Sequence, residues 1–154
     1  MNLRPYLQED LEAVASVYRD AVTGLGPQGY DAAQVAVWAS FAEDRRTFGD
    51  RLADGLTVVA EDEEGVAAFG QLHPAGHIEF LYCAPRAARR GFATAIYAWL
   101  ELQALQSGDF ALTTDASRVS RPFFEKMGFD VVEAEYVERS GVTLERFRMR
   151  KELR

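Results

Sequence analysis

The stretch from Leu81 to Thr94 reads Leu-Tyr-Cys-Ala-Pro-Arg-Ala-Ala-Arg-Arg-Gly-Phe-Ala-Thr. It leads from an apolar, alternating segment at residues 77–83 through a basic turn into a segment with helical spacing. The first turn of a helix has unpaired backbone N–H groups and the positive end of the helix dipole, and Gly91 has no Cβ to keep a ligand away. Arg89 and Arg90 add positive charge. The stretch therefore predicts a strand, a phosphate-binding turn and a helix, although a tight connection with solvated arginines has the same pattern.

Hydrophobic periodicity and turn residues divide the rest of the chain into short elements. The strand at 77–83, the following helix and a strand at 110–115 form one crossover unit, so these two strands should be parallel in an otherwise antiparallel sheet. We therefore predict an α/β (α+β) fold with a mixed, mostly antiparallel central sheet and flanking helices. Strands are expected at residues 3–6, 57–61, 67–72, 77–83, 110–115, 131–138 and 142–149, and helices at 11–24, 31–41, 43–53, 95–105 and 120–127.

Length and charge restrict the class of protein. A chain of 154 residues without repeats or linkers predicts a single domain over residues 1–154. A formal net charge of −7 argues against nucleic acid as a partner. Cys83 is the only cysteine, which excludes an internal disulfide and a multi-cysteine metal site, and we predict no metal. Because no signal-peptide pattern or membrane-spanning apolar stretch is present, we expect a cytoplasmic protein that does not contact a membrane.

Two motifs together resemble a known family. The turn Ala88-Arg-Arg-Gly-Phe-Ala93 is similar to the pattern Gln/Arg-x-x-Gly-x-Gly/Ala, with Ala88 departing from it, and Phe123-Phe-Glu-Lys-Met-Gly-Phe129 is similar to Phe-Tyr-Glu-Lys-x-Gly-Phe. Both patterns are typical of the GCN5-related N-acetyltransferase (GNAT) superfamily, and their order and spacing fit nearly the whole chain. The segment Tyr30 to Trp38 and the Asp115-Ala-Ser117 end of a strand resemble the bacterial YafP-like branch of that family.

The resemblance implies acetyl-coenzyme A (acetyl-CoA) as cofactor. In the resembled fold the two parallel strands splay apart, and the pantetheine arm of the cofactor takes the place of a strand partner between them. The backbone of residues 81–83 would then pair with the arm and polarise the thioester carbonyl. The cofactor-binding residues implied in this way are Leu81, Tyr82, Cys83, Arg89, Arg90, Gly91, Phe92, Ala93, Thr94 and Ser117.

Glu79 is the predicted catalytic base. It precedes the phosphate-binding turn, and strand alternation predicts that it points to the same face as Leu81 and Cys83. Its carboxylate could deprotonate an amine directly or through water, or bind a cationic amine; a solvated or ion-paired strand residue is the alternative. His77, the neighbour on that face, could titrate usefully but follows a turn.

The usual general acid is missing, because Phe124 occupies the position at which many family members have Tyr. A phenyl ring cannot donate a proton. Tyr82, Tyr136 and Ser117 are the candidates to protonate the leaving thiolate, and departure without assistance is the alternative, since a thiol pKa of ~8.5 makes a fair leaving group. We name Tyr82 beside Glu79 as the catalytic pair.

Substrate contacts are expected from two parts of the chain. Asp115 and Ser117 end a strand beside the predicted cleft, although both could instead cap a helix. Tyr30 and Trp38 could cover the acceptor, although packing of an amphipathic helix explains the same aromatic residues. We predict Tyr30, Trp38, Glu79 and Asp115 as substrate-binding residues.

The sequence thus predicts an acetyl-CoA-dependent N-acetyltransferase that transfers acetyl directly to a primary amine of a small molecule, with a protein N-terminus or a lysine side chain as the alternative acceptor. The alternative is a non-catalytic module that binds or senses acyl-CoA, which the departures at Ala88 and Phe124 motivate. A third hypothesis is an unrelated nucleotide binder that uses the same basic turn. Similar proteins commonly form homodimers, and nothing in the sequence fixes the oligomeric state.

Overall fold

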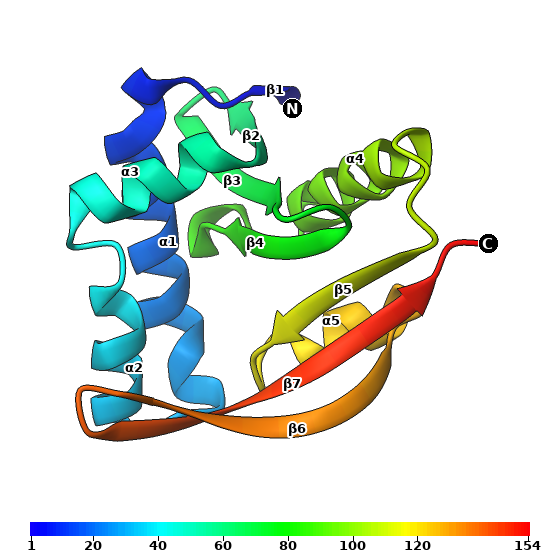
Figure 1. Ribbon diagram of the computed structural model, residues 1–154. Coiled ribbons are helices and arrows are strands. Elements are labelled where there is room, and N and C mark those ends of the chain that lie inside the picture. The colour runs from blue at the N-terminus through cyan, green and yellow to red at the C-terminus, as the bar shows by residue number, and fades with distance from the viewer.

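The computed structural model describes residues 1–154 and confirms the order of elements predicted from the sequence (Figure 1). None of its helices has the length and apolar composition that crossing a membrane requires. The strands are β1 (Asn2–Pro5), β2 (Leu56–Asp62), β3 (Gly65–Leu72), β4 (His77–Cys83), β5 (Ala111–Ala116), β6 (Asp130–Arg139) and β7 (Val142–Glu152). The helices are α1 (Leu11–Leu25), α2 (Ala32–Ser40), α3 (Arg45–Asp54), α4 (Phe92–Gln106) and α5 (Arg121–Lys126), with short 3-10 turns at Gln8–Asp10, Gly26–Gln28 and Pro85–Ala87.

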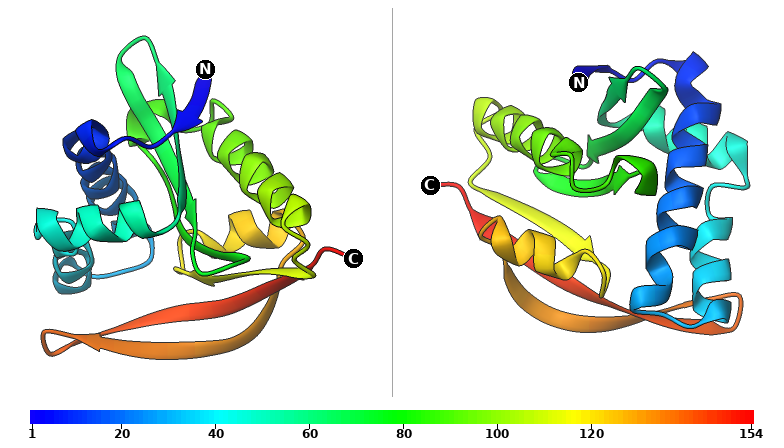
Figure 2. Two further views of the ribbon diagram at one scale, coloured as in Figure 1. Left: turned by 45° about the horizontal axis from the view of Figure 1, so that its top comes forward. Right: turned by 180° about the vertical axis from the view of Figure 1, so that it is seen from behind.

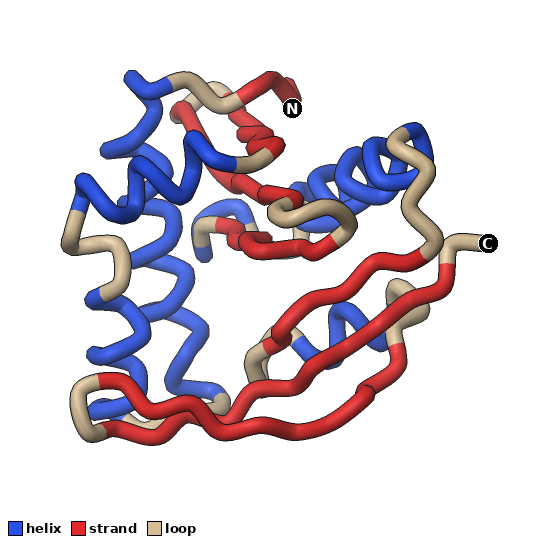
Figure 3. Tube along the Cα trace, viewed as in Figure 1, coloured by secondary structure: helices blue, strands red, loops and turns tan.

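All seven strands belong to one sheet in the order β1-β2-β3-β4-β5-β7-β6. Every neighbouring pair is antiparallel except β4 and β5, which are parallel and joined through α4. The predicted mixed sheet is therefore confirmed. Figure 3 shows the consequence in the trace: β1 to β4 form one part of the sheet, and β5, β7 and β6 form a second part that diverges from it.

Helices cover both faces of the sheet, so the central strands are apolar on both sides. Val58 and Ala60 of β2 are fully buried in a core shared with α4 and α5. Val59 and Phe69, equally buried, face a second core formed with α1, α2 and α3. The views in Figure 2 show α1 to α3 and α4 on opposite sides of β2 to β4.

Gly70 allows α4 to lie close against β3. A Cβ at this position would lie 2.5 Å from Cγ2 of Ile96 and 3.2 Å from the carbonyl oxygen of Phe80. Both neighbours are held in the packed interior, so a larger residue would push α4 away from the sheet. The start of α4 is thereby fixed relative to β4.

Side-chain caps explain where the two short helices begin. Asp31 accepts a hydrogen bond from the backbone of Gln34 at 2.8 Å, and the Gln34 side chain accepts one from the backbone of Asp31 at 2.9 Å, which is a capping box at the start of α2. Asp44 accepts from the backbone of Thr47 at 3.1 Å and begins α3. Gln34 also donates to the carbonyl of Thr143 at 2.9 Å, which fixes α2 to the β6–β7 hairpin.

Arg4 and Asp10 connect β1 to the start of α1. Two guanidinium nitrogens of Arg4 each donate to a carboxylate oxygen of Asp10 at 2.8 Å, and the Asp10 side chain is 9% exposed. The Arg4 guanidinium holds the pKa of the Asp10 carboxyl below its ordinary value. A lowered native pKa stabilises the fold above the unfolded-state value of ~3.9, and this contribution is lost as the pH falls through the native value.

We predict that Asp10→Asn lowers the free energy of unfolding by ~2 kcal/mol near neutral pH, because Arg4 loses a doubly hydrogen-bonded anionic partner. The difference between wild type and variant should shrink as the pH falls from about 5 to about 2. Urea unfolding at several pH values measures both quantities. A difference that stays constant over this range would contradict the assignment of the pH dependence to Asp10.

Candidate active site

The parallel pair β4 and β5 separates after a short contact. Only His77 with Thr113 and Ile78 with Thr114 are in register, and the hydroxyl of Thr114 donates to the carbonyl of Ile78 at 3.0 Å. Beyond Ile78 the two strands diverge (Figure 1). The edge of β4 that faces β5 is therefore without a strand partner over residues 79–83.

A β-bulge lies where the separation begins. In the pairing of β3 with β4, Leu72 is opposite Ile78 and Gln71 is opposite Phe80, so Glu79 is an extra residue on β4. The bulge interrupts the alternation of side chains. Glu79 turns toward α3, where its Oε1 accepts a hydrogen bond from Arg51 at 3.1 Å.

The expected common face of Glu79, Leu81 and Cys83 is therefore wrong. Leu81 and Cys83 pack against the core that contains α4, whereas α3 belongs to the opposite core. The prediction assumed uninterrupted alternation, and the extra residue at the bulge moves Glu79 to the other side.

A cleft of about 620 Å³ occupies the space between the two parts of the sheet. Helices α1 and α2, strands β4 and β5 and the β6–β7 hairpin all contribute to its lining. The structure brings most of the predicted site residues to this cleft, and it adds Arg51 and Arg146, which the sequence reasoning missed. The predicted residues that line it are Tyr30, Trp38, Glu79, Leu81, Tyr82, Cys83, Ala93, Asp115 and Ser117.

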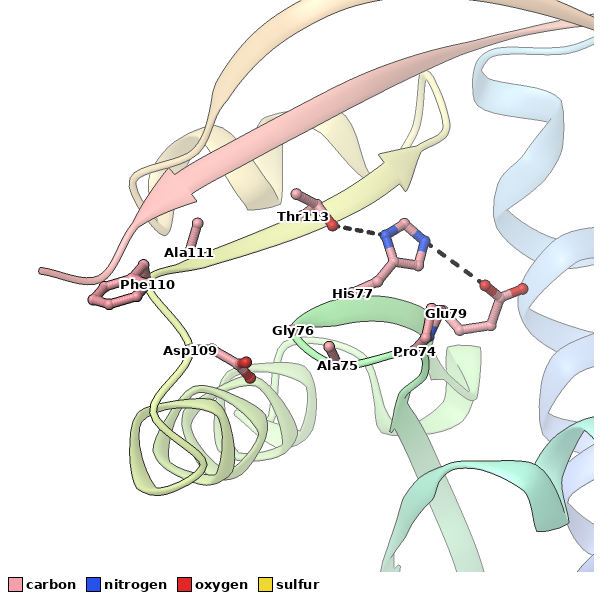
Figure 4. A pocket seen from close by; sticks show the side chains of 9 residues that line it. All are labelled: Pro74, Ala75, Gly76, His77, Glu79, Asp109, Phe110, Ala111 and Thr113. Atoms are coloured by element: carbon pink, nitrogen blue, oxygen red, sulfur yellow. Dashed lines mark hydrogen bonds and ion pairs between the residues drawn. The ribbon is translucent and has the colours of Figure 1, made fainter.

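His77 lies between the two acidic residues of the site. Its Nε2 is 3.7 Å from a carboxylate oxygen of Glu79 and 3.6 Å from one of Asp115, and its Nδ1 is 2.8 Å from the hydroxyl of Thr113. Figure 4 shows the ring held between Thr113 and Glu79. His77 and Glu79 also line an outer pocket formed with Pro74 to Gly76 and the start of β5. No His, Cys, Asp and Glu side chains in the structure are arranged to hold a metal ion.

The opposite wall of the cleft is aromatic. Tyr82 has its ring centroid 4.8 Å from that of Tyr18, and its hydroxyl accepts a hydrogen bond from the indole N–H of Trp38 at 3.3 Å. Burial raises the pKa of Tyr82 to about 12. The phenol therefore keeps its proton at neutral pH and is a weaker acid than an exposed tyrosine.

Tyr30 lines the cleft, but its hydroxyl is occupied by the backbone. It donates to the carbonyl of Glu145 at 2.6 Å and accepts from the N–H of Arg118 at 2.9 Å, and the guanidinium of Arg118 lies over the ring at 5.1 Å. Tyr30 thus joins the loop before α2 to β7 and to the loop after β5. Only the ring of Tyr30 is therefore available to contact a ligand in the cleft.

The other candidate acids differ in position. Tyr136 is 66% exposed, donates to Glu145 at 2.9 Å and does not line the cleft. Ser117 lines the cleft, but its hydroxyl accepts from the backbone of Ser120 at 3.0 Å and donates to the Ser120 hydroxyl at 3.1 Å, as expected of a turn before a helix. Phe124 is 3% exposed and fills the core beneath α5.

The start of α4 has an unused set of donors. None of the backbone N–H groups of residues 89–94 donates a hydrogen bond within the protein, and Ala95 is the first to do so, to the carbonyl of Gly91 at 3.0 Å. Gly91 has φ +84°, and a Cβ placed on it would meet no atom within 4 Å. Ala93, in the first turn, lines the cleft. This open, donor-rich turn fits an anionic group, as the sequence predicts.

The two arginines of the turn have different partners. Arg90 donates to Asp62 at 3.2 Å, shares that carboxylate with Arg86 and lies over the ring of Phe92 at 5.3 Å. The Arg86 guanidinium lowers the pKa of Asp62 to about 2. Arg89 has no ion-pair or hydrogen-bond partner, so its charge is free for a ligand. The ion pairs of Arg86 and Arg90 with Asp62 could not be predicted from the sequence, because they depend on how the strands pair.

The sequence and the fold of this chain are similar to those of known proteins. The family model of the acetyltransferase (GNAT) domain matches residues 27–153, and the chain belongs to this family. The N-acetyltransferase YafP of Escherichia coli K12 is 30% identical over 151 residues, which cover 97% of this chain and 95% of YafP.

Two solved structures show the same fold. The GCN5-related N-acetyltransferase from Rhodopseudomonas palustris has a TM-score of 0.96 and 33% sequence identity, covering 99% of this chain and 95% of that one. PaiA N-acetyltransferase from Thermoplasma acidophilum, solved in complex with coenzyme A, has a TM-score of 0.79 and 18% identity, covering 98% of each chain.

We predict that Tyr30→Phe lowers the free energy of unfolding by ~1–3 kcal/mol, because a partly buried N–H of Arg118 and a partly buried carbonyl of Glu145 lose their partner. Tyr136→Phe is the matched control, since it removes an exposed hydroxyl that bonds the side chain of the same Glu145. Its effect should be below ~0.5 kcal/mol. Urea unfolding compares the two variants, and equal effects would show that the Tyr30 hydroxyl has no special structural role.

Proposed function

We propose that this protein is an acetyl-CoA-dependent N-acetyltransferase that transfers acetyl directly to the primary amine of a small molecule. The observation that carries the proposal is the continuous path from the free N–H groups of α4, along the unpaired edge of β4, to Glu79. Acetyl-CoA supplies the acetyl group as an activated thioester. A single domain over residues 1–154, a cytoplasmic location and a homodimer remain predictions.

The residues present fit the cofactor from end to end. The N–H groups at residues 89–94 and the free guanidinium of Arg89 would hold the pyrophosphate. The backbone groups of residues 81–83 that point away from β3 would hydrogen-bond the pantetheine arm and polarise the thioester carbonyl. Burial raises the pKa of the Cys83 thiol, so this side chain contributes as an apolar neighbour and not as a nucleophile.

Direct transfer requires a neutral amine and a protonated leaving sulfur. Glu79 would take the proton of the incoming ammonium, with His77 beside its carboxylate and Asp115 on the other side of the His77 ring. The neutral amine would bond to the acetyl carbon as the carbon–sulfur bond breaks, and the second proton that the nitrogen loses would return to the acid that protonates the sulfur. Tyr82 would supply the proton to the sulfur, because it lines the cleft beside the edge of β4.

Gly91 offers a test of the cofactor site that controls for backbone strain. Gly91 and Gly108 have φ of +84° and +82°, and a Cβ at either position meets no atom within 4 Å. We predict that Gly91→Asp weakens acetyl-CoA binding by more than ~10-fold through repulsion of the pyrophosphate, while Gly108→Asp does not.

Isothermal titration calorimetry measures the affinity of wild type and both variants for acetyl-CoA. Equal weakening by the two substitutions would assign the effect to backbone strain. Absence of binding by folded wild type would overturn the proposed function.

The base has a separate test. We predict that Glu79→Gln lowers kcat by ~10²-fold or more and leaves the Kd for acetyl-CoA unchanged, because the carboxylate acts on the amine and not on the cofactor. Glu12→Gln, at an exposed ion pair on α1, is the control and should retain wild-type kcat. Coupled thiol release over a panel of amines gives the rates.

The same measurement separates the enzyme from the rival function. A protein that binds acetyl-CoA and acetylates no amine would support the non-catalytic acyl-CoA-binding module that the buried Phe124 motivates. Unchanged turnover in Glu79→Gln would remove Glu79 from the mechanism.

A further inference from the structure

Arg51 places a cation directly beside the proposed base. It comes from α3, its Nη1 donates to Glu79 at 3.1 Å, and its guanidinium lies over the ring of Phe41 at 5.5 Å. The side chain is 47% exposed and lines the cleft. The Glu79 contact is the only hydrogen bond of this side chain, so the remaining donors of the guanidinium have no partner within the protein.

The backbone below Arg51 is fixed to the sheet. The side-chain amide of Gln71, which is fully buried, donates to the carbonyl of Arg51 at 2.6 Å and to the hydroxyl of Thr57 at 2.9 Å. The end of α3 is thereby held over β3, and the guanidinium is supported by Phe41. Arg51 is thus a positioned donor and not a freely moving surface residue.

The charges around the acceptor end are mixed. Glu79 and Asp115 supply two carboxylates, while Arg51 and Arg146 supply two guanidiniums, with Arg146 3.9 Å from Asp115 and hydrogen-bonded to Glu135. An acceptor that carries only positive charge would bring its ammonium against the Arg51 guanidinium. An acceptor with both charges would match the site.

We infer that the acceptor carries a carboxylate beside its amine, as an α-amino acid does, and that Arg51 binds this carboxylate. The inference rests on the proposed function and names its substrate class. The acceptor exchanges partners with the existing ion pair: its carboxylate takes the guanidinium of Arg51, and its ammonium takes the carboxylate of Glu79. No charge is left unpaired, and Glu79 contacts the ammonium whose proton it accepts.

The aromatic wall indicates which kind of side chain the acceptor carries. Tyr18, Trp38, Phe41 and Tyr82 surround the space next to Arg51 and Glu79 and offer no charged group. Burial of an apolar side chain against these rings would add to the affinity. The favoured acceptors are therefore amino acids with apolar side chains.

The test compares acceptors that differ only in the carboxylate. Phenylalanine, leucine and methionine are each assayed beside the corresponding amide and the corresponding decarboxylated amine. The amide has the less basic amine and loses its proton more readily, so a preference for the acid cannot come from amine basicity. Wild type should show the highest kcat/KM with the amino acids.

Arg51→Gln should raise KM for the amino acids by ~10- to 100-fold and change KM for the amides by less than ~2-fold. Arg46→Gln, an exposed arginine of α3 with no ion pair, is the matched control and should behave as wild type. Acetyl-CoA binding by each variant is measured in parallel and should be unchanged.

Each outcome has a distinct meaning. Equal use of acids, amides and amines by wild type, or an equal effect of Arg51→Gln on all three, would overturn the inference and leave the proposed function intact. Acetylation of no acceptor by wild type that binds acetyl-CoA would overturn the inference together with the proposed transfer reaction.

Discussion

The constraint on which the site depends is the early end of hydrogen bonding between β4 and β5. Each strand is satisfied on its other edge, β4 by β3 through Cys83 and β5 by β7 through Ala116, so neither is free to shift toward the other. Backbone groups left unpaired in a partly buried cleft cost ~1–3 kcal/mol each unless a ligand or water supplies the partner. The gap therefore offers strong, sequence-independent donors and acceptors to a ligand with amide groups, and the free N–H groups of α4 lie at the end of the same path.

Contacts far from the gap keep it open. Tyr30 and Gln34 fix the helical part of the molecule to the carbonyls of Glu145 and Thr143 on the hairpin, on the side of the cleft away from β4. Near the start of the parallel pair, His77 and Thr113 hold the two strands together. The second part of the sheet is thus attached at both ends, and the cleft is a permanent feature of the fold and not a space that a ligand must create.

The sequence predicts this architecture because local patterns determine most of it. Helical spacing and strand alternation give the elements, and the turn around Gly91 combines a positive φ with the start of a helix, which a single glycine after basic residues indicates. The bulge at Glu79 has no such signal, since neither glycine nor proline marks it and it arises from how β3 and β4 align. The same holds for Arg51 and Asp62, whose partners are distant in the sequence and come together only through the packing of α3 and the pairing of β2 with β3. The residue types thus predict the phosphate-binding turn. The neighbours of Glu79, in contrast, follow only from the packing of the assembled sheet and helices.

The bulge also explains why the carboxylate of Glu79 lies next to an arginine in this site. An uninterrupted strand would direct Glu79 to the α4 side with Leu81 and Cys83, away from α3 and the aromatic wall. The extra residue turns it toward Arg51, with His77 beside it, and these two neighbours hold its carboxylate. A carboxylate without a partner would be costly to bury, and one paired too deeply would not be released. The single hydrogen bond from a half-exposed guanidinium lies between these limits, and it connects Glu79 to α3 as well as to its own strand β4.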